Sequence, residues 1–500
     1  YQWCVDSPPL GLNNRALIVA TLTEAPNAER LVELSSQADI LEVRADQVKD
    51  LDPDWLRSKF AGKLLYTLRS RQEGGRSEAS DARRHRRLLD AASRFDLVDL
   101  EMRRDLSAEV LAAVEPDKRI ISWHGPPSTL ISLQAVLERM QLEAARFFKI
   151  VPGAEQSRQE IAPLALLHSA KRQDLIAFAS GPIGTWTRLV SPRLGAPVVY
   201  GATSAVPGAP GQLSVEQLCN DFGLPELPEV QEVCGVVGAG IAHSLSPRIH
   251  NNAYRLLDLP FLYLPFDVEA FGEFWLEVVE SGAFAELGVS LRGFSVTAPH
   301  KRIAAAVGGA VSPLVDWLGS ANTLVRRGEV WEAESTDGEG IVQPLKAHIE
   351  SFSGVSAAVL GAGGAGRAAV AALQGQGADV TLVNRGVERG KRAAKELRVP
   401  FRELEGFDPA GQQIIIHATS LGQQPSDPLP VDPLRMTRDA ILVDLVYLPS
   451  GPTQLVRETR LAGREAIDGR EVLLMQAAPQ FQLMTGYELP IDSLREVVGL

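Results

Sequence analysis

Residues 205–250, AVPGAPGQLSVEQLCNDFGLPELPEVQEVCGVVGAGIAHSLSPRIH, decide how this chain is organised. The loop Pro207–Gln212 comes first, in which proline fixes φ and glycine permits the turns around it. The segment that follows is rich in proline and acidic residues and has no periodicity, which is typical of a linker. From Val233 the pattern predicts a fresh buried strand and then a polar turn. We therefore expect one compact unit over residues 1–222, a linker over 223–232, and a second unit from residue 233 onward.

Composition limits the functions that are compatible with the chain. Its 500 residues are 45% hydrophobic, which is enough for about three domains, and its formal net charge is −12. This charge argues against a nucleic-acid or anionic-membrane partner, and no apolar run approaches ~18 residues, so no membrane span is expected. Cys4, Cys219 and Cys234 form no CxxC pair, which indicates structural thiols in a reducing compartment. The chain begins at Tyr1 without Met, so a removed leader stays open, and a cytoplasmic location is expected.

A strand–helix rhythm runs through the first 202 residues. Most of its apolar runs are continuous rather than alternating, which suits parallel strands covered by helices. Eight such units predict a (β/α)8 barrel, and an open doubly wound sheet is the alternative. The predicted strands are Ala16–Leu22, Asp39–Val43, Lys63–Leu68, Leu97–Met102, Arg119–Trp123, Arg146–Val151, Asp174–Ala179 and Pro197–Tyr200.

Polar residues gather at the carboxyl ends of these strands, where a barrel carries its active site. Lys149 lies in the apolar run Phe147–Val151, and desolvation there would make its amine a neutral nucleophile near pH 7. Such an amine can form a Schiff base with a ketone, and His124 on the neighbouring strand is a candidate proton shuttle. A structural ion-pair cluster is the alternative. The remaining polar residues at these strand ends include Glu42, Arg44, Asp46, Arg69, Glu73, Asp99, Glu101 and Arg188.

Five motifs of this first half are LEVRAD (41–46), TLRSRQEGG (67–75), ISWHG (121–125), FFKIVPGA (147–154) and PGAPGQ (207–212). With these motifs, in this order, residues 13–222 resemble type I 3-dehydroquinate dehydratase. The resemblance implies that Lys149 forms a Schiff base with the C3 ketone of 3-dehydroquinate, and that His124 removes the C2 proton and helps to hydrolyse the imine. It also implies that Arg188 holds the substrate carboxylate, while the ring hydroxyls are met by Glu42, Arg44, Arg69, Glu73 and Gln212. Gly208 departs from the family, whose closing loop usually carries Ser there.

Residues 233–327 predict a further α/β unit, with strands at Cys234–Val237, Phe261–Phe266, Gly293–Val296 and Ala321–Val325. Polar residues follow several of these strands. Ser244 and Ser246 precede Pro247, where capping of the next helix is the alternative to a binding role. Lys301 follows the third strand, and its alternative is an ordinary lysine at the start of a helix.

A glycine-rich turn follows the buried strand that begins at Ser356. Gly361, Gly363 and Gly366 form a G-x-G-x-x-G pattern that opens a helix of small residues, which is typical of a dinucleotide site. The next predicted strand, Asp379–Val383, ends in Asn384-Arg385 where NAD sites usually carry an acid. Because arginine suits a 2′-phosphate, and Arg389 adds a second positive charge, the pattern predicts NADP(H). Further strands are expected at Gln413–Ile416 and Ala440–Val446, and an amphipathic helix at Asp468–Leu483 that packs on the preceding α/β unit.

The motifs AHSLSP (242–247), TAPHK (297–301), ANT (321–323), STDG (335–338), GAGGAGR (361–367), NR (384–385), ATSLG (418–422) and VYLP (446–449) occur in that order. Residues 232–490 therefore resemble shikimate dehydrogenase. The resemblance implies that Lys301 and Asp337 form the proton-transfer pair. It implies that Ser244, Ser246 and Tyr447 bind the substrate carboxylate, while Thr297, Asn322 and Gln476 align the ring. The residues assigned to the cofactor are Gly361, Gly363, Gly364, Ala365, Gly366, Asn384, Arg385, Arg389, Thr419 and Ser420. Gly386 and His417 replace a Thr and an Asn that the family often has.

Together the two resemblances imply a bifunctional enzyme that dehydrates 3-dehydroquinate to 3-dehydroshikimate and then reduces this product to shikimate with NADPH. A quinate dehydrogenase in the second half, or a metabolite-sensing regulator without catalysis, are the alternatives. The expected domains of the second half are a substrate domain over 233–340, completed by 468–490, and a NADP-binding domain over 341–467. No metal ligand is expected because the eight His residues show no H-x3-H or Cys–His spacing, and the oligomeric state stays open. The basic run Arg83–Arg87 predicts an exposed helix face, with a patch for a polyanion as the alternative.

Overall fold

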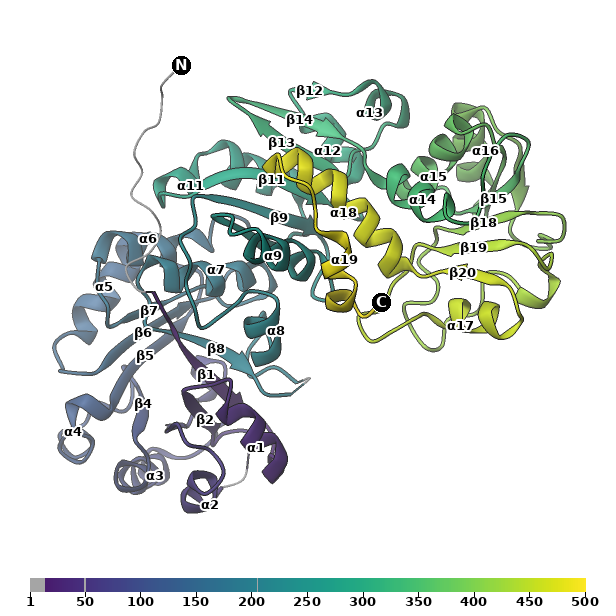
Figure 1. Cartoon of the computed structure of the whole chain (residues 1–500). Helices are drawn as coiled ribbons and strands as arrows, with labels where there is room; N and C mark the ends of the chain where they lie inside the picture. The colour runs from purple at the N-terminus through teal and green to yellow at the C-terminus, as the bar shows by residue number, and fades with distance from the viewer. Residues whose placement is uncertain (1–13, 49–50, 205) are drawn as a thin grey trace. The chain divides into compact units, whose positions relative to one another are not determined.

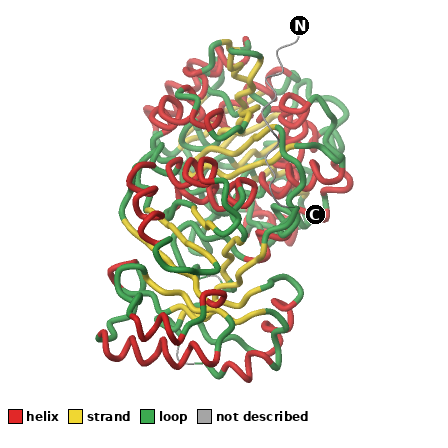
Figure 2. Tube along the Cα trace, turned by 90° about the vertical axis from the view of Figure 1, so that its left-hand side faces the viewer, coloured by secondary structure: helices red, strands yellow, loops and turns green. Residues whose placement is uncertain are grey.

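The structure is a computed structural model that describes residues 14–48, 51–204 and 206–500, so that Cys4 lies outside the described part. The chain forms two compact units, of which the first holds residues 1–233 with 260–291 and the second holds 234–259 with 292–500. Figure 2 shows helices on either side of the strands in both units. Among the described residues, no helix combines the length and the apolarity that crossing a bilayer requires.

Eight parallel strands form the sheet of the first unit, in the order β7-β6-β5-β4-β3-β2-β1-β8 (Figure 1). Each strand pairs with its neighbour in sequence, and β1 also pairs with β8, so the sheet wraps round and its seam lies between β7 and β8. The barrel prediction is therefore confirmed over the open doubly wound sheet. The strands are β1 (Leu17–Leu22), β2 (Ile40–Arg44), β3 (Lys63–Thr67), β4 (Leu97–Glu101), β5 (Arg119–Gly125), β6 (Phe147–Pro152), β7 (Leu175–Ala177) and β8 (Val198–Ala202).

Helices alternate with these strands. They are α1 (Ala28–Ser35), α2 (Pro53–Arg57), α3 (Asp81–Arg94), α4 (Ala108–Ala113), α5 (Leu130–Met140), α6 (Ile161–Ala170), α7 (Thr185–Val190) and α8 (Val215–Asn220). Side-chain caps fix several of their starts, such as the Asn27 side chain that accepts from the backbone of Arg30, and the capping box of Ser214 and Gln217.

The core inside the barrel is apolar near the amino ends of the strands, where Val19, Ile40, Leu65 and Ile120 pack together. Because strand side chains alternate, the residues two and four positions after Ile40 on β2 lie on the same face, and these are Glu42 and Arg44. The interior of the barrel thus changes from apolar to polar toward its carboxyl end.

The predicted exposed face of α3 is confirmed for Arg83 and Arg86 and wrong for Arg84. Of the run Arg83–Arg87 on α3, Arg84 is buried and bonds to both carboxylate oxygens of Asp105, at 2.6 Å each. The cause is helical spacing, because the buried positions of α3 are 84, 88, 91 and 92, so that Arg84 falls on the inner face.

A mixed six-stranded sheet follows, in the order β10-β9-β11-β13-β14-β12. Its strands are β9 (Glu232–Gly238), β10 (Phe261–Asp267), β11 (Ser290–Val296), β12 (Ala310–Val311), β13 (Thr323–Arg327) and β14 (Val330–Glu334). The helices around it are α9 (Ser246–Leu256), α10 (Phe271–Phe274), α11 (Ala283–Glu286), α12 (Lys301–Val307) and α13 (Pro313–Leu318), and a π-helical turn over Trp275–Glu280 continues α10.

The third sheet is fully parallel, in the order β17-β16-β15-β18-β19-β20, which is the strand order of a dinucleotide-binding fold. Its strands are β15 (Ser356–Leu360), β16 (Asp379–Asn384), β17 (Phe401–Glu403), β18 (Ile414–His417), β19 (Ile441–Asp444) and β20 (Glu465–Ile467). The helices are α14 (Asp337–Leu345), α15 (Gly364–Gly375), α16 (Val387–Leu397), α17 (Gln454–Leu461), α18 (Gly469–Thr485) and α19 (Ile491–Leu494). Helix α18 contacts α9, α14 and β13, which confirms that the predicted C-terminal helix packs back on the preceding α/β unit.

Candidate active sites

Lys149 is the buried amine of the barrel. Strand β6 holds it with 5% of its surface exposed, and its Nζ lies 3.9 Å from the centre of the Tyr200 ring and 3.7 Å from Asp99 Oδ2. Burial lowers the pKa of Lys149, and the positive charges of Arg69 and Arg44 act in the same direction, while Glu42 and Asp99 oppose them. The environment therefore favours the neutral, nucleophilic amine.

His124 lies beside Lys149 at the end of β5, the strand that pairs with β6. Burial lowers its pKa well below the ordinary value, and Arg69 and Lys149 add to this effect, so the ring is neutral at neutral pH. Glu73 Oε2 accepts a hydrogen bond from the backbone N–H of His124 at 3.0 Å and lies 3.3 Å from Nδ1. Burial raises the pKa of Glu73 to about 7. A proton on Nδ1 facing Glu73 leaves Nε2 as the basic nitrogen.

Arg69 contacts several carboxylates close to Lys149 and His124. Its guanidinium donates to Asp99 Oδ1 at 2.8 Å and to Ser122 Oγ at 2.9 Å, and contacts Glu73 and Glu101 at 3.3 Å each. These charges hold the guanidinium protonated, so Arg69 is a fixed positive charge in the floor of the site.

The loop that carries Gly208 and Gln212 closes over the barrel mouth. Arg44 donates to Gly208 O at 2.8 Å, Gly208 N–H donates to Gln212 Oε1 at 2.9 Å, and Gln212 Nε2 donates to Thr21 Oγ1 at 3.0 Å. Thr21 in turn donates to Glu42 at 2.8 Å. One chain of hydrogen bonds thus joins three segments, β1, β2 and the closing loop.

Arg188 lies on α7, with its guanidinium 4.3 Å from the centre of the Phe178 ring and 3.3 Å from Pro210 O. Burial lowers the pKa of Arg188 to about 10. A buried guanidinium with this little compensation is suited to receive an anion.

All eight residues predicted for the barrel site come together in the structure. Seven of them line one cavity of about 60 Å³, while Glu73 lies behind His124 and contacts it. The sequence analysis assigned no role to Thr21, Tyr200 or Asp99, although Asp99 was visible as a carboxylate in an apolar strand. Thr21 and Tyr200 lie in β1 and β8, and only the closure of the barrel brings them to the site.

Lys301 and Asp337 form the central pair of a second site. Lys301 opens α12 and Asp337 opens α14, and Nζ donates to Asp337 Oδ2 at 2.6 Å. Asn322 Nδ2 donates to the other carboxylate oxygen, Oδ1, at 2.8 Å. Asn322 is itself fixed, because its Oδ1 accepts from the backbone N–H of Thr336 at 2.8 Å. The carboxylate therefore holds the ammonium in one orientation.

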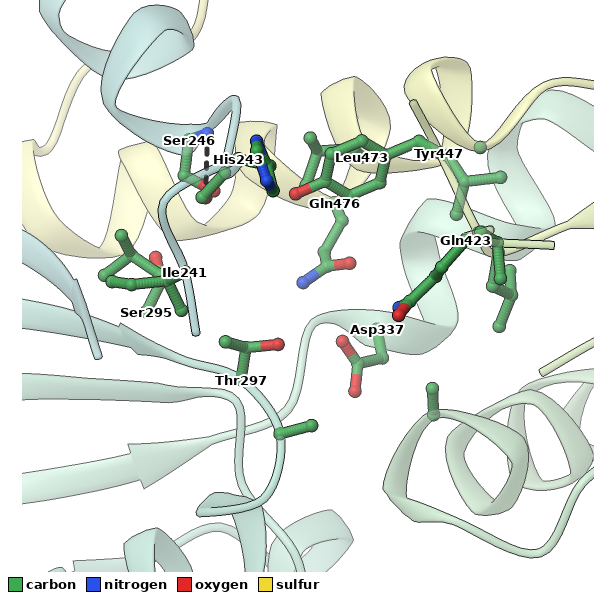
Figure 3. Close-up of a pocket in the computed structure, with 18 of the residues that line it drawn as sticks. Ile241, His243, Ser246, Ser295, Thr297, Asp337, Gln423, Tyr447, Leu473 and Gln476 are labelled. Atoms are coloured by element: carbon green, nitrogen blue, oxygen red, sulfur yellow. Dashed lines mark hydrogen bonds between the residues drawn. The ribbon is translucent and has the colours of Figure 1, made fainter. Parts of the chain in front are cut away.

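This pair lies in a cavity of about 650 Å³. Figure 3 shows Thr297, Asp337 and Gln476 directed into it from different elements. Ser244, Ser246 and Tyr447 line the same cavity, and the Ser244 side chain bonds to Tyr447, whose pKa is raised by burial. Asn322 does not line the cavity, since it lies buried behind Asp337. His243 and Gln423 also line the cavity and were not predicted.

The glycine-rich turn has the geometry that its sequence predicts. Gly361 has a φ of +117°, and a Cβ on it would lie 2.6 Å from Ala418 O. A Cβ on Gly366 would lie 2.0 Å from Gly361 O, so only glycine lets α15 approach its strand this closely. Asn384 Oδ1 accepts from the backbone N–H of Ala362 at 3.1 Å and ties the end of β16 to the turn.

Five of the ten predicted cofactor residues line one of two cavities. Ala365 and Thr419 line the large cavity beside Lys301, while Gly363, Gly364 and Arg389 line a neighbouring cavity of about 440 Å³. Arg385 is exposed at the end of β16. Ser420 is exposed and lines neither cavity.

His417 replaces the Asn of the family pattern, and the structure shows what it contacts. Its ring is buried, with Nδ1 2.8 Å from Asp444 Oδ1 and Nε2 2.6 Å from Thr419 Oγ1. The imidazole therefore orients Thr419, whose side chain lines the large cavity.

The fold and the two sites define a class of protein, a (β/α)8 barrel joined to a dehydrogenase with a dinucleotide-binding sheet. Comparison with known proteins agrees with this class. The family model of type I 3-dehydroquinase matches residues 16–222, and the model of the shikimate dehydrogenase substrate binding domain matches residues 236–324.

Three known proteins illustrate the similarity. A shikimate dehydrogenase (NADP(+)) of Methanopyrus kandleri is 35% identical over 53% of this chain and 94% of its own length. A chloroplastic bifunctional 3-dehydroquinate dehydratase/shikimate dehydrogenase of Arabidopsis thaliana is 27% identical over 98% of this chain and 85% of its own length. The crystal structure of shikimate dehydrogenase from Aquifex aeolicus has a TM-score of 0.49 and 29% identity, covering 54% of this chain and 98% of that one. The chain belongs to the shikimate dehydrogenase family, with a type I 3-dehydroquinase barrel at its N-terminal side.

Proposed function

We propose that the barrel converts 3-dehydroquinate to 3-dehydroshikimate and that the second unit reduces this product to shikimate with NADPH. The observation that carries the proposal is the pairing of reactive groups in both sites. A buried amine lies beside a neutral imidazole in the barrel, and an ammonium contacts a fixed carboxylate beside the glycine-rich turn. A regulator that had lost catalysis would have no need of either pair.

In the barrel, the Lys149 amine attacks the C3 ketone, and loss of water gives an imine whose positive form withdraws electrons from C2. His124 Nε2 accepts the C2 proton, while Glu73 holds the proton on Nδ1. The C1 hydroxyl leaves with a proton as water, and hydrolysis of the imine releases the product and restores Lys149. Arg188 binds the carboxylate of the ring, and Glu42, Arg44, Arg69 and Gln212 meet its hydroxyls.

In the second unit, Lys301 donates a proton to the alkoxide that forms when the ketone is reduced. Asp337 holds the Lys301 ammonium in place, and Asn322 keeps Asp337 in place. The substrate carboxylate would lie against Ser244, Ser246 and Tyr447, which share one side of the cavity. In Figure 3, Gln476 reaches into the cavity from the side of Ser246 and Tyr447, and Thr297 faces it from the opposite side.

The residues present fit NADP(H), which supplies the hydride when it is bound. Gly361, Gly363 and Gly366 leave room for a pyrophosphate to approach the N-terminus of α15, where backbone N–H groups point outward. Gly364 and Ala365 continue this turn, and Asn384 braces it. Arg385 and Arg389 supply positive charge for a 2′-phosphate. Thr419 would face the nicotinamide end of the site.

The domain boundaries that accompany this proposal are residues 1–222 for the dehydratase, 223–232 for the linker, 233–340 with 468–490 for the substrate domain, and 341–467 for the NADP-binding domain. A cytoplasmic location also stays a prediction.

A coupled assay tests both activities at once. With 3-dehydroquinate and NADPH alone, the protein should consume NADPH, because the product of the first site is the substrate of the second. Lys149→Ala should abolish consumption from 3-dehydroquinate and leave it unchanged when 3-dehydroshikimate is supplied. If Lys149→Ala still consumes NADPH with 3-dehydroquinate, the second unit is a quinate dehydrogenase. If the unaltered protein consumes none with either substrate, the proposal is wrong.

A further inference from the structure

A second cavity of the first unit lies on the outer side of the barrel, where residues of β2, β3 and α3 line it. It measures about 390 Å³, which is within the range of small-molecule sites. Its described lining residues include Arg83, Arg86, Arg87 and Arg94 and one acid, Asp90.

The arginines that line this outer cavity differ in their ion-pair partners. Arg94 is shared between Asp52 and Asp90, at 3.3 and 3.6 Å. Arg83 and Arg86 are exposed on α3, and among the described residues neither has an ion-pair partner. A partly enclosed site with uncompensated guanidinium groups is suited to an anion, since arginine presents a planar fork to carboxylate or phosphate.

The base of the outer cavity is apolar and aromatic. Tyr66 and Phe95 form a pair of rings with centroids 5.1 Å apart, and Val43 lies beside them. The guanidinium of Arg87 lies 6.0 Å from the centre of the Tyr66 ring. An apolar ring can therefore contact this base while its anionic group meets the arginines at the rim.

The outer cavity and the dehydratase site share the strands β2 and β3. Because strand side chains alternate, Glu42 and Arg44 face the catalytic cavity while Val43 and Ala45 line the outer one. Arg87 Nη2 donates to Ala45 O at 3.2 Å, directly beside Arg44, whose guanidinium holds the closing loop at Gly208 O. An anion that draws Arg87 away from Ala45 would loosen the segment that positions Arg44.

We propose that the outer cavity binds a small organic anion with a flat apolar ring, and that occupancy weakens substrate binding in the dehydratase through β2. The site is distinct from both candidate active sites, with which it shares no lining residue.

Isothermal titration of the full chain with phenyl phosphate, benzoate and inorganic phosphate tests the binding. The two ring-bearing anions should bind saturably and inorganic phosphate more weakly, and comparing phenyl phosphate with benzoate identifies the preferred acid. Arg83→Gln with Arg86→Gln should weaken binding by roughly tenfold, since two partly exposed ion pairs are lost. Arg139→Gln, an exposed arginine on α5, is the matched control and should change nothing.

Dehydratase kinetics test the coupling. Phenyl phosphate should raise the KM for 3-dehydroquinate by roughly fivefold at unchanged kcat, and the double variant should lose this effect. Reduction of 3-dehydroshikimate should be unaffected. The proposal is overturned if no ring-bearing anion binds. It is also overturned if the double variant is inhibited as strongly as the unaltered protein, because the anion then acts in the catalytic cavity, or if binding leaves KM unchanged.

Discussion

Gly208 offers the sharpest test of how the dehydratase closes over its substrate. Type I enzymes usually carry Ser at this loop position, so Gly208→Ser would restore the family motif and add a hydroxyl near the ring. The structure predicts the opposite effect. A Cβ at residue 208 would lie 2.8 Å from Thr21 Cγ2 and 3.0 Å from Gln212 Oε1. Carbon atoms normally approach to about 3.5–4.0 Å, so the loop would have to move by nearly 1 Å.

Such overpacking typically costs about 1–3 kcal/mol. The loop would relieve it by moving outward, which lengthens the bonds from Arg44 to Gly208 O and from Gln212 to Thr21. We therefore expect Gly208→Ser to raise the KM for 3-dehydroquinate by roughly 5- to 100-fold, since each 1.4 kcal/mol corresponds to a factor of ten. The chemical step should change little, because the three atoms nearest to a Cβ at residue 208 belong to Thr21, Gln212 and Thr23 and none to Lys149 or His124.

The compensating change is Thr21→Ser, which removes the Cγ2 methyl and keeps the hydroxyl that bonds to Glu42 and Gln212. Steady-state formation of the conjugated enone of 3-dehydroshikimate should show that Thr21→Ser alone is nearly neutral and that the double variant regains most of the lost affinity. A double-mutant cycle with no coupling, or a Gly208→Ser enzyme with unchanged KM, would refute the steric argument.

Three further predictions concern charge. Burial raises the pKa of Glu160 from 4.5 to about 7. The protonated carboxyl therefore stabilises the fold at low pH, and this contribution is lost as the pH rises to 7. Chemical denaturation should show that the free energy of unfolding of the unaltered protein falls by about 3 kcal/mol relative to that of Glu160→Gln between pH 4 and pH 8. Burial raises the pKa of Glu73 to about 7, and Glu73 must be ionised to hold His124, so the dehydratase kcat should fall as the pH drops below 7. Glu73→Gln should lower kcat by roughly 100-fold and should abolish this fall in the pH–rate profile. Arg385→Ser should raise the KM for NADPH by roughly tenfold and leave the KM for NADH unchanged, and equal effects on both cofactors would contradict the proposed 2′-phosphate contact.

The strands of the barrel were predictable from sequence because each is a continuous apolar run that helices bury on one side. Both ends of all eight strands lie within two residues of the predicted bounds. The strands β12, β14, β17 and β20 were missed for a physical reason. Each has two to five residues, and β14, with the sequence VWEAE, is only partly buried, so no local pattern separates it from a loop.

Some of the site residues could likewise be predicted from the sequence, and others could not. Lys149, His124, Lys301 and Asp337 stand in motifs whose order along the chain identifies them. Thr21 carries no such signal, because its importance comes from a bond to Gln212, which lies 191 residues further along the chain. Composition alone did not predict the burial of Arg84, which belongs to the most basic run of the chain and is nevertheless buried against Asp105. Helical spacing, rather than charge, decided its position.

The two sites use the same residue types, a lysine near an aspartate, for opposite purposes. In the barrel, Lys149 Nζ lies 3.7 Å from Asp99, and Arg69 contacts the same carboxylate at 2.8 Å, so the positive charge of Arg69, which lowers the pKa of Lys149, stands beside the negative charge that raises it. Burial is the largest effect and lowers the pKa of Lys149, which favours the nucleophilic amine. In the second unit, Lys301 contacts Asp337 directly at 2.6 Å, and no arginine shares that carboxylate among the described residues. The pair keeps its proton available for an alkoxide. A competing guanidinium therefore distinguishes the Schiff-base lysine from the acid, and Arg69→Gln should move Lys149 toward the behaviour of Lys301.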